Sequence, residues 1–252
     1  MANTVSSLRS MLIGLPAYTP GRFIYQSLFD KAAILRRKNR QEFYAAFVQP
    51  GDIVFDVGAN LGNYSEAFRA VGATVVAIEP DPRNVKMLRK RLKGEHFHIV
   101  PCALGRSEGT AELRIASDRD DVSTLSNQWA DVTEAHWQGS VQVQVKTLDS
   151  IAEEFGIPKY VKVDAEGYDA EVLRGMSFRP LMVSFEYLPR DLRIARECTE
   201  LLGEFSFNFV IEERSRFELD QWVCKEEILL VLSTLDSSIH YGDVFARNSL
   251  AQ

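Results

Sequence analysis

The sequence predicts an α/β fold in which a mostly parallel sheet is covered by helices on both faces. Short apolar runs rich in β-branched residues recur along the chain after residue 51. Amphipathic segments with helical spacing separate these runs, as expected for strands joined by crossover helices. The chain has 252 residues, of which 46% are hydrophobic, so it can bury one such domain together with additional segments.

Five apolar runs are expected to be core strands, at 53–57, 74–78, 98–100, 160–163 and 181–185. The intervening helices are expected at 65–71, 82–92, 148–155, 169–173 and 191–202. Two further apolar runs, 207–211 and 228–232, are expected to be the last strands.

Residues 1–50 differ in pattern and are expected to form a helical extension ahead of a domain at 51–252. An apolar stretch at 11–15 is interrupted by Pro16 and is too short for a signal peptide or a membrane span. These helices could cover an active site or form a homodimer, and the sequence leaves both open. A basic run within them predicts a solvent-exposed helix face: Arg36, Arg37, Lys38 and Arg40.

The charge and the cysteines restrict the class of partner and the compartment. The chain has 29 basic and 35 acidic residues, so its net charge is −6. An acidic protein neutralises phosphates poorly, which disfavours nucleic acid as a partner. The cysteines are odd in number and widely spaced, without a disulfide or zinc pattern, which favours a cytoplasmic setting: Cys102, Cys198 and Cys224.

The segment 110–147 departs from the α/β rhythm and is expected to be an insertion. Residues 111–115 and 141–145 alternate apolar with polar side chains, as half-exposed strands do. The polar segment between them carries Trp129, His136 and Trp137. We expect a lid on a β-ribbon, in which the two tryptophans either stack on an acceptor or fix the loop to the core.

A glycine-bearing turn follows the first strand. Asp56 is the last residue but one of that strand. Gly58 and Gly62 in the turn allow the backbone to turn sharply and to approach a ligand. Asn60 occupies the position of the middle glycine in a dinucleotide-binding turn, where close backbone approach to pyrophosphate is required. A dinucleotide is therefore disfavoured, whereas Asp56 could attract a cationic cofactor.

An acidic residue follows the second strand. Glu79 lies 21 positions after Gly58, where nucleoside-binding α/β proteins hold ribose hydroxyls. Asp81 precedes Pro82, a combination typical of a helix N-cap with proline in the first turn. The sequence thus predicts ribose binding by Glu79 and helix capping by Asp81.

Five motifs together resemble the FkbM-type methyltransferases, over about residues 51–232: 55–65, 79–82, 101–105, 147–150 and 162–167. The resemblance implies a class I methyltransferase fold, Rossmann-like, with a seven-stranded sheet in the order 3-2-1-4-5-7-6 and only strand 7 antiparallel. It also implies S-adenosyl-L-methionine as cofactor, a small-molecule or glycan hydroxyl as acceptor, and these cofactor-binding residues: Asp56, Gly58, Asn60, Gly62, Glu79, Cys102, Ala103 and Leu104.

The fourth strand ends in Lys162, Val163 and Asp164, beside the first strand in the implied order. Strand alternation places Lys162 and Asp164 on one side, and a lysine in a core strand needs a partner carboxylate. A hydroxyl acceptor benefits from a general base or a metal. The catalytic candidates are Asp164, Lys162, Glu186 and His136, with Glu166 weaker; Mg²⁺ is allowed but not favoured. We also expect Asp169 to cap the next helix.

The leading hypothesis is O-methylation of a sugar, polyketide or other natural product by an S-adenosylmethionine-dependent enzyme. The alternatives are a non-catalytic binding module with the same fold and an NAD(P)-dependent oxidoreductase, against which Asn60 argues. A base-directed nucleic-acid methyltransferase is disfavoured because residues 164–167 read Asp-Ala-Glu-Gly in place of an Asn/Asp-Pro-Pro-aromatic motif.

Overall fold

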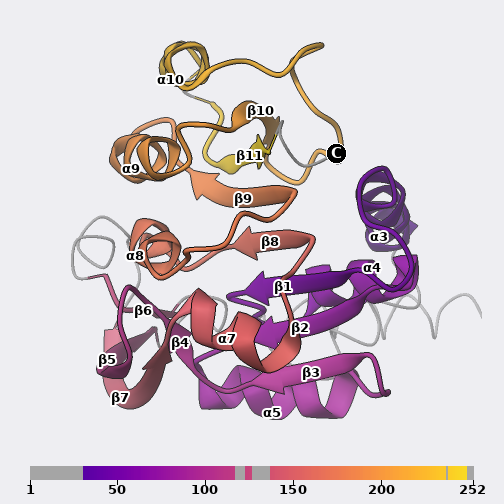
Figure 1. Cartoon of the computed structure of the whole chain (residues 1–252), viewed down its shortest axis with the longest axis vertical. Helices are drawn as coiled ribbons and strands as arrows, with labels where there is room; N and C mark the ends of the chain where they lie inside the picture. Colours follow the sequence, from indigo (N-terminus) through magenta and orange to yellow (C-terminus); the bar gives the residue numbers. More distant parts are fainter. Residues whose placement is uncertain (1–30, 117–122, 127–136, 237, 249–252) are drawn as a thin grey trace, which may run out of the picture.

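The computed structural model describes residues 31–116, 123–126, 137–236 and 238–248. Its centre is a seven-stranded sheet in the order β10-β11-β9-β8-β1-β2-β3 (Figure 1). The strands are β1 Ile53–Val57, β2 Thr74–Ile78, β3 Phe97–Val100, β8 Tyr160–Val163, β9 Met182–Tyr187, β10 Ser206–Ile211 and β11 Gly242–Arg247. Only β11 runs antiparallel to its neighbours. This is the predicted class I methyltransferase topology.

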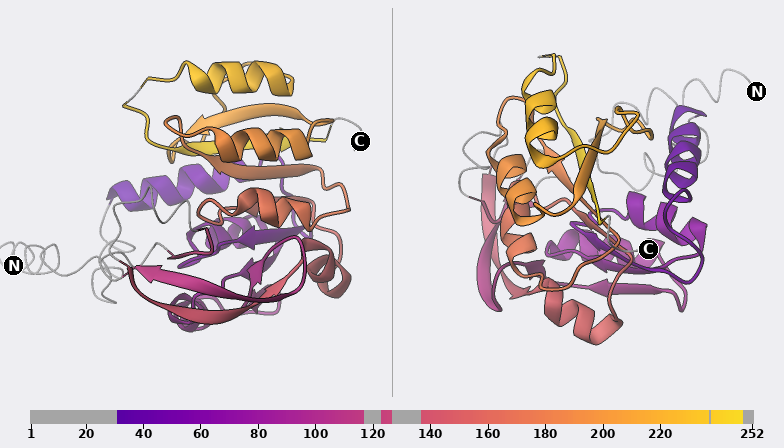
Figure 2. Two further views of the ribbon diagram at one scale, coloured as in Figure 1. Left: turned by 90° about the vertical axis from the view of Figure 1, so that its left-hand side faces the viewer. Right: turned by 45° about the horizontal axis from the view of Figure 1, so that its top comes forward.

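Helices cover both faces of this sheet (Figures 1 and 2). On one face lie α7 Leu148–Phe155, α8 Asp169–Arg174, α9 Arg193–Leu201 and α10 Lys225–Ser233, whose buried apolar residues form the largest core cluster. On the other face lie α3 Lys31–Tyr44, α4 Asn63–Val71 and α5 Pro82–Arg91. Among the described residues, no helix combines the length and the apolarity needed to cross a bilayer.

Helix α3 packs closely on the sheet rather than standing apart from it. The rings of Phe43, Tyr44 and Phe47 form a cluster with Phe68 of α4, Tyr160 of β8 and Phe245 of β11. Tyr160 and Phe245 are nearly parallel, with ring centroids 6.2 Å apart. The described part of the N-terminal extension is therefore built into the core.

The inserted segment forms a second sheet in the order β4-β7-β5-β6. Its strands are β4 Ala103–Leu104, β5 Gly109–Ala116, β6 Ser123–Thr124 and β7 Trp137–Lys146, and the long β5–β7 pair is the predicted ribbon. Trp137 packs against Ala116 at the end of this ribbon, whereas Trp129 and His136 lie outside the described residues.

The prediction of a strand at 228–232 is wrong, because this segment belongs to helix α10. Cys224 and Glu227 form a capping box at its start. Ile228 and Leu232 are buried while Leu230 is 66% exposed, which is the four-residue spacing of a helix. The last strand of the sheet is β11, which the sequence reading did not identify. A smaller error concerns Asp169, which is the first residue of α8 rather than its N-cap.

Candidate active site

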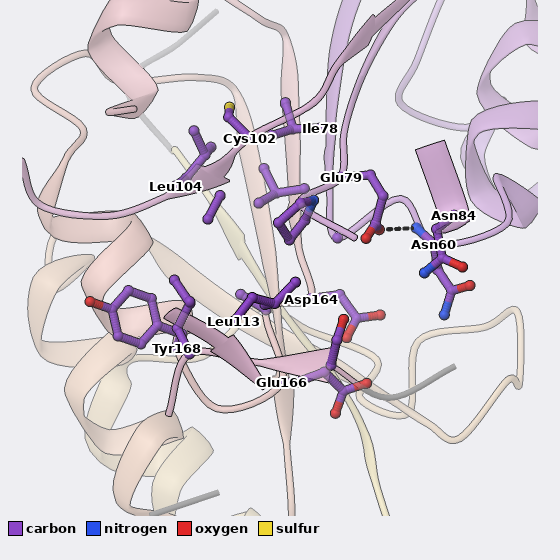
Figure 3. Close-up of a pocket in the computed structure, with 17 residues that line it drawn as sticks. Asn60, Ile78, Glu79, Asn84, Cys102, Leu104, Leu113, Asp164, Glu166 and Tyr168 are labelled. Carbon is purple, nitrogen blue, oxygen red and sulfur yellow. Dashed lines mark hydrogen bonds between the residues drawn. The ribbon is translucent and has the colours of Figure 1, made fainter. Parts of the chain in front are cut away.

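A pocket open to solvent lies where β1, β2 and β8 end (Figure 3). The carboxyl ends of parallel strands meet at this edge, between the sheet and the inserted ribbon. The predicted residues Gly58, Asn60, Glu79 and Asp164 all line it. The other lining residues are Val57, Ile78, Pro80, Asn84, Cys102, Ala103, Leu104, Leu113, Ser123, Leu125, Ala165, Glu166 and Tyr168.

The turn after β1 needs glycine at two positions, for different reasons. Gly58 has φ +75°, and a Cβ atom there would lie 1.8 Å from the backbone oxygen of Asp164. Gly62 has φ +78°, and its Cβ would meet Leu92 of the segment after α5 at 2.4 Å. Gly58 therefore lets β1 and β8 approach each other at the pocket, whereas Gly62 packs against α5 and does not line the pocket.

Glu79 is held by the backbone on both sides. Its two carboxylate oxygens accept hydrogen bonds from the amides of Asn60 at 2.7 Å and of Asp81 at 2.8 Å. Burial raises the pKa of Glu79 to about 7 even though these donors oppose the shift. Asp81 caps α5 as predicted, because its side chain accepts from the Arg83 amide at 2.8 Å.

The far end of the pocket is apolar. Ile78 ends β2 and Cys102 follows β3, whereas Leu104 of β4, Leu113 of β5 and Leu125 after β6 belong to the inserted sheet. Burial raises the pKa of the Cys102 thiol to about 12, so this thiol is a protonated, small apolar wall group at neutral pH. Figure 3 shows Cys102 and Leu104 at one end and Asp164 and Glu166 at the other.

The inserted sheet contacts the loop after β8 through one buried hydroxyl. Thr124 is 1% exposed; its Oγ1 donates to the Glu166 carbonyl at 2.8 Å and accepts from the Ser126 amide at 2.8 Å. Glu166 has φ +50°, a left-handed conformation uncommon outside glycine. The insertion thus holds an unusual turn of the loop that carries Asp164.

Lys162 and Asp164 form the predicted pair. Lys162 Nζ donates to Asp164 Oδ2 at 2.7 Å and lies 4.4 Å from the centroid of the Tyr64 ring. The lysine side chain is 1% exposed and that of Asp164 is 32% exposed. Burial opposes protonation of Lys162, but the nearby Asp164, Asp243, Tyr64 and Asp56 raise its pKa well above the ordinary value. Lys162 is therefore a fixed cation.

Asp56 lies behind the pocket rather than in its wall. Its carboxylate is 1% exposed, sits opposite Lys162 in the β1–β8 register, and accepts from Ser65 Oγ of α4. Its other oxygen, Oδ1, is buried with no hydrogen-bond partner among the described residues. Burial raises the pKa of Asp56, while Lys162 and Ser65 oppose that shift.

Two further carboxylates face the same side of the sheet. The hydroxyl groups of Ser184 on β9 and Tyr160 on β8 are hydrogen-bonded, so both side chains lie on one face of the sheet. Glu186 is two residues after Ser184, and strand alternation places it on the same face as Ser184, Tyr160 and Lys162. The pKa of Glu186 is raised well above its usual range, mainly by burial and further by the negative charges of nearby carboxylates: Asp164, Glu166, Asp169 and Asp243. Asp243 of β11 is the cross-strand partner of Glu186 and was missed by the sequence reading.

A family model, the methyltransferase FkbM domain, matches residues 56–217. The chain belongs to this family. The match begins at Asp56, at the end of β1, and extends past β10 to residue 217. The FkbM domain of this protein thus contains the glycine turn, Glu79 and the Lys162–Asp164 pair. It leaves out α3 and β11, although both pack into the same core.

Two characterised relatives are methyltransferases. The hexuronic acid methyltransferase AglP of Haloferax volcanii is 24% identical over 230 residues, which span 86% of this chain and 90% of AglP. The chloroplastic ribosomal RNA small subunit methyltransferase of Arabidopsis thaliana is 36% identical over 81 residues, or 32% of this chain and 24% of that protein. The solved magnesium protoporphyrin IX methyltransferase from Synechocystis is 10% identical, with a TM-score of 0.45 and coverages of 98% and 92%.

The FkbM site therefore gathers most of the residues singled out in the sequence. Gly58, Asn60, Glu79 and the 102–104 segment lie around one pocket, and Asp164 closes one end of it. Asp56 and Gly62 support this pocket from behind. Among the described residues, no three histidine, cysteine or carboxylate side chains are placed to share a metal ion. His136 belongs to the part of the chain outside the description.

Proposed function

We propose that this protein transfers a methyl group from S-adenosylmethionine to a hydroxyl group of a sugar or another small natural-product acceptor. The observation that carries the proposal is a single pocket with Glu79 on one wall, an apolar slot at one end and the Asp164 loop at the other. A nucleoside cofactor and an acceptor can meet in such a pocket. Membership of the FkbM family supplies the reaction class.

The residues fit S-adenosylmethionine better than a dinucleotide. The oxygens of Glu79 retain lone pairs for ribose hydroxyls in addition to the two backbone donors. The slot formed by Ile78, Cys102 and Leu104 suits a flat, apolar base. Asn60, with φ +49°, places a side chain where a pyrophosphate would need bare backbone. The buried Asp56 Oδ1 adds negative potential beneath the turn, which favours a cationic ligand.

When bound, the sulfonium of the cofactor supplies an activated methyl group, so the protein mainly aligns the acceptor. Lys162 remains protonated and therefore orients Asp164 rather than removing a proton. Glu186 is the better candidate for general base, because a carboxylate with a raised pKa accepts a proton more readily once ionised. Asp164 then positions the acceptor hydroxyl at the pocket end.

A carbohydrate acceptor is supported by the relative AglP, whose name describes methylation of a hexuronic acid. Carboxylates such as Asp164 and Glu166, which line the pocket, are suitable hydrogen-bond acceptors for the hydroxyl groups of a polyol. The acidic residues of the pocket also disfavour a nucleic-acid acceptor, because they would repel its phosphates.

Incubation with methyl-labelled S-adenosylmethionine tests this function. Extracts and a panel of sugars and glycans are incubated with wild-type protein and with Glu79→Ala, and products are identified by mass spectrometry. We expect one class of acceptor to gain a labelled methyl group on oxygen with the wild type alone. Binding of a partner that Glu79→Ala leaves intact, without any labelled product, would instead support a non-catalytic module.

A further inference from the structure

Two charged residues outside the FkbM segment 56–217 interact with Tyr64, the ring that Lys162 also contacts. Arg40 comes from α3, before the segment, and Asp243 comes from β11, after it. The basic run of α3 was expected to be solvent-exposed, and Arg36, Arg37 and Lys38 are exposed. Arg40 departs from that expectation, because only 12% of its side chain is exposed.

Arg40 reaches the same aromatic ring as Lys162. Its guanidinium carbon lies 4.3 Å from the centroid of the Tyr64 ring, while Lys162 Nζ lies 4.4 Å from it. Arg40 also donates to the Asn63 carbonyl at 3.4 Å, at the start of α4 and directly after the glycine turn. Arg40 also forms an ion pair with Glu213 at 3.6 Å. Two cations on one ring require nearby negative charge.

Asp243 is placed to supply that charge. Phe245, two residues further along β11, packs against Phe43 of α3 and against Phe47 in the turn after α3. Strand alternation puts Asp243 on this same face, opposite Glu186 in the register. Asp243 interacts electrostatically with Lys162 and with Arg40, and it acts on Tyr64. The carboxylate therefore lies within electrostatic reach of both cations.

We propose that Arg40 and Asp243 are positioning residues that hold Tyr64 and the Lys162–Asp164 pair in their working arrangement. This inference rests on the proposed function, in which Asp164 positions the acceptor. It gives helix α3 a role in the site: the segment before the family domain contributes a cation to the arrangement as well as apolar packing. Arg40 and Lys162 both contact the ring of Tyr64, and the charge of Asp243 acts on both cations.

The charge of Asp243 reports directly on this network. Burial raises its pKa to about 6, Lys162 opposes the shift, Asp164 and Asp169 add to it, and Arg40 opposes it. Glu186 faces it from β9. Removal of the Arg40 charge should therefore raise the pKa of Asp243 further. The neighbouring Arg37 offers a matched control on the same helix, with 49% of its side chain exposed and an ion pair to Glu66.

The test follows the carboxyl carbon of Asp243 by NMR titration in ligand-free protein labelled with ¹³C-aspartate, with the signal assigned by its loss in Asp243→Asn. We expect the midpoint to rise by roughly 0.5–1 pH unit in Arg40→Met and to stay unchanged in Arg37→Met. Arg40→Lys should restore it. An unchanged midpoint in Arg40→Met, or equal shifts in both methionine variants, would overturn the proposal. Arg40→Gln is a second neutral variant should Arg40→Met fold poorly.

Steady-state kinetics are the second measurement that tests the proposal. Arg40→Met should lower kcat about tenfold and leave the cofactor Kd within about twofold of wild type, because the change lies on the acceptor side. A parallel loss of cofactor binding, turnover and melting temperature would contradict a positioning role and indicate structural damage alone. The NMR titration needs no substrate, so a failed network and a failed methyl-transfer proposal give different results.

Discussion

The backbone oxygen of Asp164 lies 1.8 Å from where a Cβ atom on Gly58 would stand. The ends of β1 and β8 thus touch through a residue that has no side chain, at the floor of the pocket. The same loop is also held by the Thr124 hydroxyl, which donates to the Glu166 carbonyl at 2.8 Å. The position of Asp164 is consequently fixed by backbone contacts as well as by Lys162.

Gly58→Ala should be strongly destabilising. The added methyl group meets backbone that cannot move aside, and φ +75° is strained for alanine, so we expect a loss of about 3 kcal/mol or more of unfolding free energy. Gly109→Ala is the matched control, because a Cβ there meets nothing within 4 Å. Urea unfolding compares the two; equal stability of both variants would refute the close-approach explanation.

Glu79 should make cofactor binding depend on pH. Its pKa of about 7 in the folded protein means that acidification below neutrality protonates the carboxylate and removes acceptors for ribose hydroxyls. Affinity should therefore be full above pH 8 and weaken by roughly tenfold at pH 6. Calorimetric titrations between pH 5.5 and 8.5 measure this. Glu79→Gln should bind weakly with a flat pH profile, and a wild-type profile that is equally flat would disprove the assignment.

Removal of the buried cation should cost stability as well as activity. Lys162→Met leaves Asp164, Asp56 and Asp243 without their shared positive charge, and we expect a loss of about 3 kcal/mol in unfolding free energy. Lys162→Met combined with Asp164→Asn should recover part of that loss, because one uncompensated charge is removed with its partner. Strictly additive losses in this double-mutant cycle would mean that the pair does not interact energetically.

Glu186 should control the acidic limb of the pH–rate profile. A general base must be ionised, so the raised pKa of Glu186 predicts that turnover increases with pH through that pKa and then levels off. Glu186→Gln should lower kcat by about 100-fold or more and remove this limb. Asp164→Asn should lower turnover while retaining the limb. The reverse pattern, with the limb lost only in Asp164→Asn, would transfer the role of base to Asp164.

The hydrogen bond between Thr124 of the inserted sheet and the loop after β8 can be removed by replacing one oxygen atom. Thr124→Val keeps the shape but removes the hydroxyl from Glu166 and Ser126, and should weaken cofactor binding by about tenfold. Thr124→Ser should retain the bond and the affinity. Thr110→Val, at an exposed position of β5, is the control. Unchanged affinity in Thr124→Val would show that β6 does not help to shape the pocket.

Much of the fold was predictable because its core strands are short, continuous apolar runs ended by characteristic residues. The glycine turn, Glu79, the Asp81 cap and the Lys162–Asp164 pair each follow from local chemistry, and the structure confirms their placement. Helix α10 was predicted as a strand because its continuous apolar run, 228–232, has the length of the true core strands, and its capping residue is a cysteine, which is not a usual N-cap.

The remaining parts of the site depend on tertiary structure. Asp243 lies at the start of β11, which runs antiparallel to β9. The first residues of β11, rather than its last, therefore lie at the edge where the parallel strands end. Arg40 differs from Arg37 only in the face of α3 it occupies, which a charge run does not reveal. Gly62 looked like a ligand-contact glycine, yet its neighbours are Leu88 and Leu92.

Isothermal titration calorimetry of the purified protein with S-adenosylmethionine, in parallel with NADH, tests the central claim most directly. The pocket built around Glu79, Asn60 and Cys102 predicts saturable one-to-one binding of S-adenosylmethionine, loss of that binding in Glu79→Ala, and no heat with NADH. Well-folded wild-type protein that fails to bind S-adenosylmethionine, or that binds NADH instead, would contradict the account.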